Sequence, residues 1–382
     1  MLRTISIVCA VLVPLFSLAD PILIGIHARS TYMRATVQMT NGSMEIYAGD
    51  SVLITINKGQ SADITASGSK VSVFLQGKNY SGHSKLEGRA LAITEFKVIP
   101  SGQKSSTRLY TGDLIAQPAE GRLQLINRIE IEDYVAGVIE AEGGAGHQIE
   151  YYKVQAVISR TYALNNLNRH QQLGFDLCDA THCQVYQGRP RHESQAVTAT
   201  ENTKDIVIVD PEIKLITATF HSNCGGHTNN AEDVWSKPVT YLVGKKDTFC
   251  TKMDQAFWTK TFAKSTWSEY IRNNKVNYEN LASEDGVFLV NNPQTLYWID
   301  SSSYIPLRKM REDLKLRSTK FTVTHQGDQV ILRGRGFGHG VGLCQEGAIR
   351  MAQLGYNYTD IIAYYYKDIH LISREMLWFF EE

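Results

Sequence analysis

The sequence predicts an α+β fold, in which an N-terminal antiparallel β region packs with a mixed α/β core. Within residues 20–120, short runs rich in β-branched residues are separated by Gly, Ser and Asn, as in antiparallel strands. Around residue 130, the apolar residues change to helical spacing. After residue 175, strand-like and helical segments are mixed without regular alternation, which favours α+β over repeated βαβ units.

The N-terminal strands are expected in the runs SVLITIN (51–57), KVSVFLQG (70–77) and RLQLINRIEI (122–131). The first helix is expected where Tyr134, Val135, Val138 and Ile139 recur at helical spacing, and the run Gly143-Gly144-Ala145-Gly146 is expected to end it. A second helix is expected from about 149 to 167.

In the second half of the chain, DIVIVD (205–210) and LITATFH (215–221) read as strands. Residues 250–325 carry Trp and many charges and are interpreted as an insertion or a peripheral helical region. The end of the chain is expected to hold a strand QVILRG (329–334), a glycine-rich loop and short helices near 347–354 and 359–366. We therefore divide the chain into 1–19, a β-rich region 20–120 and a larger unit 121–378.

The composition excludes some classes of function. The 382 residues contain 39 Lys+Arg and 39 Asp+Glu, for a formal net charge of +0. A nucleic-acid-binding protein needs an excess of cations against phosphate, so this balance disfavours such a partner. It equally gives no support to a polybasic membrane-surface protein.

The N-terminus reads as a signal peptide. Arg3 precedes an apolar run over residues 5–16, and Ser17-Leu18-Ala19 places small residues where a signal peptidase cuts. Cleavage after Ala19 would send the mature chain to the periplasm or another extracytoplasmic space. The alternative, an uncleaved membrane anchor, remains open.

Five cysteines follow the expected cleavage site, and an odd number leaves at least one of them outside an intramolecular disulfide. Cys178 and Cys183 lie in the motif CDATHC, with His182 between them. Two thiolates and an imidazole this close are a candidate zinc site, whereas export favours a disulfide instead.

Glu142 is the candidate catalytic residue. The apolar stripe of the first helix predicts its next position at 142, where a carboxylate stands in place of an apolar side chain. Loss of water favours the protonated form and raises the carboxyl pKa, which is what a general acid requires. The alternative is an ordinary glutamate at a frayed helix end, reaching solvent.

Three further clusters hold possible site residues. Arg160 and Tyr162 lie on the second helix, where an arginine is usually part of an ion pair between elements. The segment FHSNCGGHTNNAEDVW begins at residue 220. The segment RGRGFGHGVGLCQEGA begins at 333, and its alternating glycines suggest tightly packed backbone that presents His339. GxGxxG, GK[ST], GxSxG and HExxH are absent, which disfavours nucleotide binding, serine hydrolases and zincins.

Taken together, the motifs resemble the SpoIID/LytB family. The matching stretches cover roughly residues 125–370 and are IEIEDYVAGVIEAE, KVQAVISRTYAL, CDATHCQVYQG, FHSNCGGHTNNAEDVW and GFGHGVGLCQEGA. The resemblance implies an exported lytic transglycosylase of peptidoglycan. Such an enzyme cuts the MurNAc–GlcNAc β-1,4 bond of strands stripped of stem peptides by a partner amidase, and leaves a 1,6-anhydro-MurNAc end. A non-catalytic amidase enhancer or glycan-binding module, and a zinc-dependent hydrolase, remain alternatives.

The resemblance also implies roles for individual residues. Glu142 falls on the family's catalytic glutamate, and a zinc ion, more structural than catalytic, would bind Cys178, His182 and Cys183, with His170 as a possible further ligand. Cys224 and Cys250 are expected to form a disulfide. The expected contacts with substrate are Arg160, Tyr162, Gln184, His221, His339 and Gln345. The chain departs from the family where Gly143-Gly144 replace Met-Pro, and where Cys344 and Glu346 replace Ser and Tyr.

Overall fold

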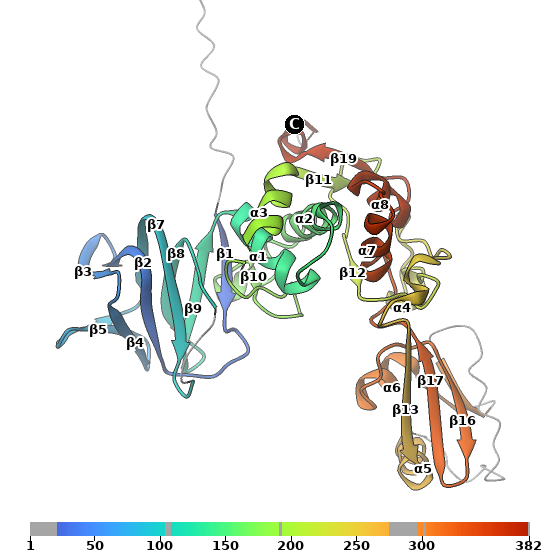
Figure 1. Ribbon diagram of the computed structural model, residues 1–382. Helices are drawn as coiled ribbons and strands as arrows, with labels where there is room; N and C mark the ends of the chain where they lie inside the picture. Colours follow the sequence, from blue (N-terminus) through green and yellow to red (C-terminus); the bar gives the residue numbers. More distant parts are fainter. Residues whose placement is uncertain (1–20, 104–107, 191–192, 275–295, 301–302, 381–382) are drawn as a thin grey trace, which may run out of the picture.

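The computed structural model describes residues 21–103, 108–190, 193–274, 296–300 and 303–380. The expected signal peptide lies outside these residues. In Figure 1 the molecule runs from an N-terminal sheet, through a helical middle part, to a small projecting unit. Among the described residues, none of the helices has the length and apolar character needed to cross a bilayer.

The N-terminal part is one large sheet whose order is β10-β1-β9-β8-β7-β2-β4-β5-β6, with β3 paired to β2. All of its pairs are antiparallel except β1 with β10. Buried residues alternate along part of the sheet, as Ala35, Val37 and Met39 do on β2, because successive side chains point to opposite faces. The strands are β1 (Ile22–Ile26), β2 (Arg34–Ala48), β3 (Ser51–Asn57), β4 (Ser61–Ser67), β5 (Lys70–Leu75), β6 (Lys78–His83), β7 (Leu86–Pro100), β8 (Asp113–Ala119), β9 (Arg122–Ile129) and β10 (Leu177–Cys178).

The helical middle part is built around α2, which is buried on nearly every side. It contacts α1, α3, α7, α8 and β11. Apolar and polar residues alike are buried on α2, so this helix lies in the interior of the fold. The elements of this part are α1 (Ile131–Gly143), α2 (Ile149–Leu164), η1 (Gln171–Leu173), α3 (Glu193–Asn202), β11 (Ile206–Val209), α7 (Gln345–Gln353), α8 (Tyr358–Tyr365), β19 (His370–Ser373) and η3 (Arg374–Phe380).

The segment that follows β11 is mostly loop, held by a short parallel ladder. β12 (Phe220–His221) pairs with β18 (Leu343–Cys344), which brings together two segments about 120 positions apart. Two short helical turns, α4 (Glu232–Trp235) and η2 (Phe249–Lys252), complete this region.

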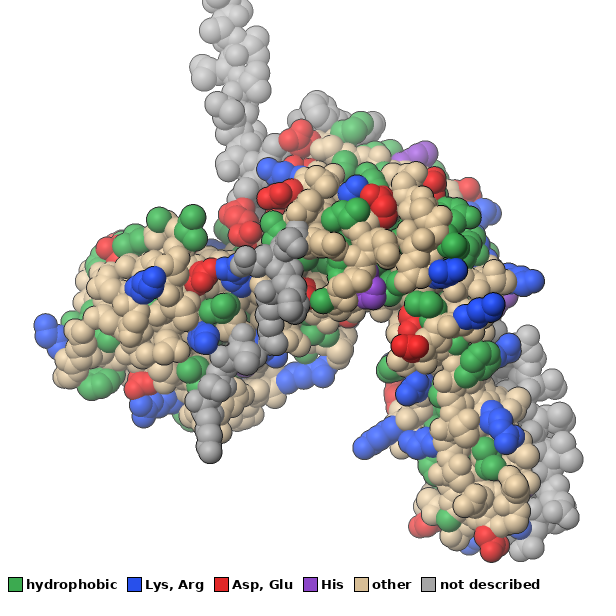
Figure 2. All heavy atoms as spheres, viewed as in Figure 1, with side chains coloured by type: hydrophobic (Ala, Val, Ile, Leu, Met, Phe, Trp, Pro, Cys, Tyr) green, Lys and Arg blue, Asp and Glu red, His purple; other side chains and the backbone are tan. Residues whose placement is uncertain are grey.

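The projecting unit has a small core of its own. Trp258, Trp267 and Leu332 lie at its centre, apart from the main core. Figure 2 shows the visible face hollowed between this unit and the N-terminal sheet, with Lys and Arg side chains on both flanks. Its elements are β13 (Phe257–Ala263), α5 (Lys264–Asn273), β14 (Leu296–Asp300), β15 (Ser303–Pro306), α6 (Leu307–Asp313), β16 (Phe321–Gln326) and β17 (Gln329–Arg335).

The observed elements confirm the α+β class, with antiparallel strands at the N-terminus. Two local expectations were wrong. The second helix ends at Leu164 rather than 167, and the run 215–221 forms a regular strand only at Phe220–His221, with an isolated bridge at Leu215. The sheet also continues past residue 120, because β9 and β10 complete it. The expected domain boundaries stay a prediction.

Candidate functional site

Glu142 is the second-to-last residue of α1 and continues the apolar stripe of that helix. Tyr134, Val135, Val138 and Ile139 are all fully buried, as the spacing predicts. The Glu142 side chain is half-buried, and its Oε1 accepts a hydrogen bond of 2.6 Å from the backbone N–H of Val185. The carboxyl group is therefore fixed by a neighbouring loop.

The surroundings of Glu142 favour its protonated form. Burial raises the pKa of the Glu142 carboxyl above its usual range, and the Val185 hydrogen bond, which favours the carboxylate, offsets this only in part. A carboxylic acid with a raised pKa can donate a proton closer to neutral pH. This is the electrostatic condition for a general acid.

The glycine-rich loop after α1 is held by tyrosines of α2. Gly144 ends the helix at φ 72°, a left-handed value that favours glycine. The Tyr152 hydroxyl donates to the Gly144 carbonyl (3.0 Å) and accepts from the backbone N–H of His147 (3.2 Å). A hollow of about 280 Å³ adjoins this loop, lined by Glu140, Gly144, Ala145, Gly146, Tyr152, Gln195 and Ala196.

Gln345 connects the last motif to the first. Its side-chain Nε2 donates to the backbone carbonyl of Glu142 at 3.3 Å, across 203 positions of sequence. Gln345 begins α7 directly after β18, whose Cys344 is paired with His221 of β12. The family motifs around 142, 221 and 345 thus lie side by side.

His221 and His339 form a neutral pair beside this ladder, with ring centroids 5.5 Å apart. His339 Nδ1 accepts from the Val341 N–H (3.1 Å), so its proton is on Nε2, which donates to the Phe220 carbonyl (3.0 Å). Burial lowers the pKa of His339 to about 4 and that of His221 well below its usual value. His221 Nδ1 donates to the Val341 carbonyl at 3.1 Å, and its buried Nε2 has no partner among the described residues.

The alternating glycines pack against the segment around His221. A Cβ on Gly338 (φ 113°) would stand 2.7 Å from the His221 Cβ, and one on Gly340 (φ 80°) 2.5 Å from the Asn229 amide nitrogen. Only glycine fits such approaches without displacing its neighbour. The glycine-rich segment therefore packs closely against the segment 219–229.

Arg160 is not brought to the site. Its guanidinium group is fully buried and makes a bidentate pair with Glu132 of α1, at 2.8 and 2.5 Å. It also donates to the Ile206 carbonyl at 3.0 Å. Arg160 therefore forms a structural ion pair that links α1 and α2 to β11, in place of the expected substrate contact. This is the ion pair between elements that was the alternative for this residue.

Tyr162 lies on α2, and Gln184 lies in the loop that binds Glu142. The half-buried Tyr162 hydroxyl accepts from Arg169 at 2.8 Å. Gln184 is 1% exposed, and its Oε1 accepts from the Tyr134 hydroxyl at 3.3 Å. Because Gln184 precedes Val185, it supports the N–H that holds Glu142 rather than presenting its amide to solvent.

The motif CDATHC and His170 converge on one point. His170, Cys178, His182 and Cys183 each offer a ligand atom, and these atoms all lie within 4.8 Å of one another. The Cys183 sulfur is 3.3 Å from His170 Nε2 and 3.7 Å from His182 Nδ1. Two thiols and two imidazoles are a donor set that fits a tetrahedral zinc ion.

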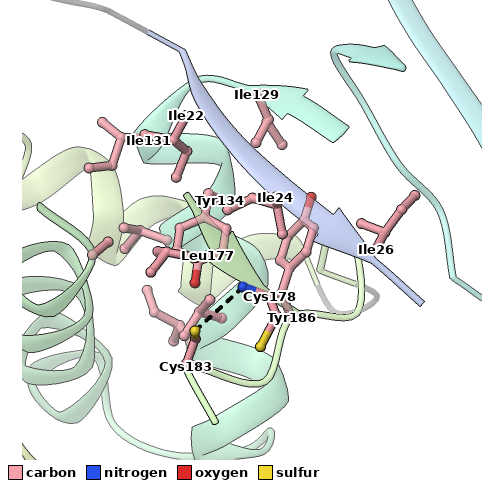
Figure 3. Packing of buried hydrophobic residues seen from close by; sticks show 14 of the residues in the cluster. Ile22, Ile24, Ile26, Ile129, Ile131, Tyr134, Leu177, Cys178, Cys183 and Tyr186 are labelled. Atoms are coloured by element: carbon pink, nitrogen blue, oxygen red, sulfur yellow. Dashed lines mark hydrogen bonds between the residues drawn. The ribbon is translucent and has the colours of Figure 1, made fainter. Parts of the chain in front are cut away.

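This cluster lies at the edge of the sheet. Figure 3 shows Cys178 and Cys183 below Ile24 of β1, beside Tyr134 of α1, with the Cys178 N–H donating to the Cys183 sulfur at 3.4 Å. A cavity of about 330 Å³ reaches the cluster and is lined by His170, Cys178 and His182 together with β1 and the segment that follows it.

Cys224 and Cys250 are not joined by the expected disulfide. Their sulfurs are 3.3 Å apart, and all five cysteines of the described chain are free thiols. Cys344 and Asp247 share the same buried space with these two thiols.

Sequence reasoning missed three contributors to these sites. The Val185 N–H that binds Glu142 is a backbone group, so the type of residue at position 185 does not indicate the contact. Asp247 was overlooked, although its spacing to Cys250 matches the two-residue gap of paired metal ligands. Cys344 was noted only as a departure from the family motif.

Several known proteins are similar to this chain in sequence. The SpoIID family model, described as stage II sporulation protein, matches residues 119–209. The chain is 32% identical to an uncharacterized protein of Brachyspira hyodysenteriae over 273 residues, 69% of this chain and 72% of that protein. It is 30% identical to the stage II sporulation protein D of Bacillus subtilis over 268 residues, 66% of this chain and 77% of that protein.

A further relative is the amidase enhancer of Bacillus subtilis, 30% identical over 292 residues, which are 62% of this chain and 40% of that protein. The family model spans Glu142, Arg160 and the CDATHC motif. On these similarities, this chain belongs to the SpoIID/LytB family.

Proposed function

We propose that this protein is a lytic transglycosylase that remodels the bacterial cell wall. It cleaves the MurNAc–GlcNAc β-1,4 bond of peptidoglycan and forms 1,6-anhydro-MurNAc ends. The observation that carries the proposal is the half-buried Glu142, with its raised carboxyl pKa, at the end of the apolar stripe of α1. Relatives named stage II sporulation protein D and amidase enhancer support a role at the cell wall.

Glu142 acts first as the acid and then as the base. Its protonated carboxyl donates to the glycosidic oxygen, and the sugar passes through an oxocarbenium-like state. The carboxylate then takes the proton from the C6 hydroxyl of the same MurNAc, whose oxygen closes onto C1. One carboxyl group suffices, in contrast to the paired carboxyl groups of glycoside hydrolases. The hydrogen bond from the Val185 N–H stabilises the carboxylate before it takes up that proton.

The substrate is a glycan strand stripped of its stem peptides by a partner amidase. Removal of the peptide frees the lactyl carboxylate of each MurNAc, and the Lys and Arg side chains that flank the hollow in Figure 2 match that negative charge. Trp235, 39% exposed with its ring 5.4 Å from that of His339, offers a flat apolar face on which a sugar ring can stack. This role requires export, as the expected signal peptide implies.

A structural zinc ion is proposed at His170, Cys178, His182 and Cys183. Four protein ligands fill a tetrahedral site and leave no open position for water, unlike a catalytic zinc. The ion would fix the segment 178–183, which leads directly into Gln184 and Val185. This arrangement favours the transglycosylase over the zinc-dependent hydrolase.

The test is product analysis of the purified protein on denuded glycan strands and on intact sacculi. Wild-type protein is expected to release fragments that lack one water relative to hydrolytic products, the signature of the anhydro end in mass spectrometry. Glu142→Gln is expected to reduce this release by ~10²–10⁴-fold, the range for general acid–base catalysis. Glu269→Gln, an exposed glutamate on α5, is the matched control and keeps full activity.

The second candidate is a non-catalytic enhancer of an amidase, which the relative of that name favours. Such a protein binds denuded glycan and releases nothing from it by itself. The enhancer function would be favoured over the transglycosylase if wild-type protein stimulates an amidase and binds glycan but forms no anhydro ends.

A further inference from the structure

Four potential metal ligands meet in the buried interior of the C-terminal half. Cys224 follows β12, Asp247 and Cys250 flank the start of η2, and Cys344 ends β18. Their ligand atoms all lie within 4.8 Å of one another, and each residue is at most 1% exposed. The proposed glycan chemistry uses none of the four side chains.

The distances suit a shared cation better than a disulfide. The Cys224 sulfur is 3.3 Å from the Cys250 sulfur and 3.3 Å from Asp247 Oδ2. A disulfide requires sulfurs about 2.05 Å apart. Zinc–sulfur bonds of about 2.3 Å in a tetrahedron place two sulfurs about 3.8 Å apart, so a small shift completes the zinc geometry.

The chemistry of the donors also selects zinc. Three thiols with one carboxylate are soft ligands with one hard partner, a set that favours zinc over calcium or magnesium. Asp247 and Cys250 are separated by two residues, the spacing by which a tight turn presents two ligands to one ion.

Hydrogen bonds from neighbouring groups orient the residues of the cluster. The Cys224 N–H donates to the Cys344 sulfur at 3.3 Å. Asp247 is oriented by the Phe249 N–H (2.9 Å to Oδ1) and the Tyr365 hydroxyl (3.0 Å to Oδ2). In metal sites, contacts of this kind fix the orientation of the side chains that bind the ion.

A nearby cation offsets part of the negative charge of the cluster. Three thiolates and one carboxylate around a divalent ion leave two negative charges, which are costly in a buried site. The Lys320 ammonium donates to the Cys224 carbonyl at 3.0 Å and to the His227 carbonyl, so one positive charge lies against the cluster.

We propose that Cys224, Asp247, Cys250 and Cys344 form a second structural zinc site. This site joins η2 to the β12–β18 ladder, and Gln345, which binds the Glu142 carbonyl, directly follows its ligand Cys344. The proposal does not depend on the glycan activity.

Metal content tests the proposal. The untagged full chain, purified anaerobically, is analysed for zinc per protein, together with Cys344→Ser and the double variant Cys178→Ser/Cys183→Ser. We expect Cys344→Ser to lose one equivalent of zinc, both alone and when added to the double variant. Unchanged zinc content in both backgrounds would overturn the proposal.

A cobalt titration keeps the test valid even if Cys344→Ser does not fold, because it leaves all four proposed ligands intact. Co²⁺ added to Cys178→Ser/Cys183→Ser should give thiolate-to-cobalt charge transfer and the intense visible bands of a tetrahedral site. Their absence overturns the proposal.

The competing disulfide is tested separately. Peptide mapping of wild-type protein without reduction should show Cys224 and Cys250 as thiols. A linked peptide pair lacking two hydrogens would show a Cys224–Cys250 disulfide and overturn the zinc site.

Discussion

At the scale of the residue, burial of Glu142 has two opposite effects. It favours the protonated form that the proposed reaction needs, and it destabilises the folded protein when the carboxyl group is charged. A carboxylate held against an apolar core loses part of its hydration, which is the cause of its raised pKa. The same loss of water that prepares the proton for donation makes the charged form unfavourable in the folded protein.

Glu142→Gln should therefore be at least as stable as wild type at neutral pH. A group with a raised folded-state pKa favours folding below its ordinary pKa, and this contribution is lost as the pH rises through the folded value. The melting temperatures of the two proteins should coincide in acid, and the variant should gain on wild type as the pH increases. A neutral-pH melting temperature lower for Glu142→Gln would contradict the desolvation argument.

The activity should follow the same ionisation. Glu142 must be protonated to begin the reaction, so the rate of anhydro-end formation should fall as the pH rises through its pKa, which burial places above the usual range for glutamate. Rates on soluble denuded glycan over a pH series measure this limb. A rate that is flat from acid to alkaline pH would assign the proton donation to another group.

At the scale of the element, α1 is pressed against the loop that holds Glu142. A Cβ at Gly137 would stand 2.3 Å from the Gly188 carbonyl and 2.7 Å from the Tyr186 ring. Val185, whose N–H binds Glu142, belongs to the same loop. Close contact at Gly137 therefore sets the distance between the helix and its hydrogen-bond donor.

Gly137→Ala should destabilise the protein, although alanine ordinarily stabilises a helix by ~0.5–1 kcal/mol relative to glycine. Overpacking of this kind costs ~1–3 kcal/mol, and a shifted loop should also lower the activity. Denaturant unfolding measures the loss. Gln353→Ala on the exposed face of α7 is the control and should be close to neutral. A Gly137→Ala variant more stable than wild type would show that the loop moves easily to make room for the added methyl group.

Several elements of the site were predictable because their signal is local. The stripe of Tyr134, Val135, Val138 and Ile139 predicts both the helix and the place of Glu142. The contacts that complete the site are long-range, and a single sequence does not encode them in any short pattern. Arg160 illustrates this, since its partner Glu132 stands on another helix. The expected Cys224–Cys250 disulfide took no account of the third thiol, Cys344, which lies in the same buried cluster, and it stays a prediction that peptide mapping tests.

At the scale of the whole molecule, the proposed zinc ligands belong to different elements of the fold. His170 and the CDATHC motif join the loop after α2 to the strand edge at β10. Such a cross-link limits the freedom of the unfolded chain and supports the fold without taking part in the reaction.

Removal of zinc should therefore lower the melting temperature more than it lowers the turnover of the protein that remains folded. Thermal unfolding and anhydro-product assays, each before and after treatment with a chelator, measure the two effects. Restoration of the melting temperature by added Zn²⁺ is the control. Immediate loss of activity at an unchanged melting temperature would favour the zinc-dependent hydrolase.

The hydrogen bond from Gln345 to the Glu142 carbonyl has a consequence for biosynthesis. A chain secreted from its N-terminus delivers the acid long before the amide that steadies it, since 203 positions separate them. Under the proposed function, a partly translocated chain would hold Glu142 without the Gln345 side chain that binds its carbonyl, so the site would be complete only after the last motif had crossed the membrane.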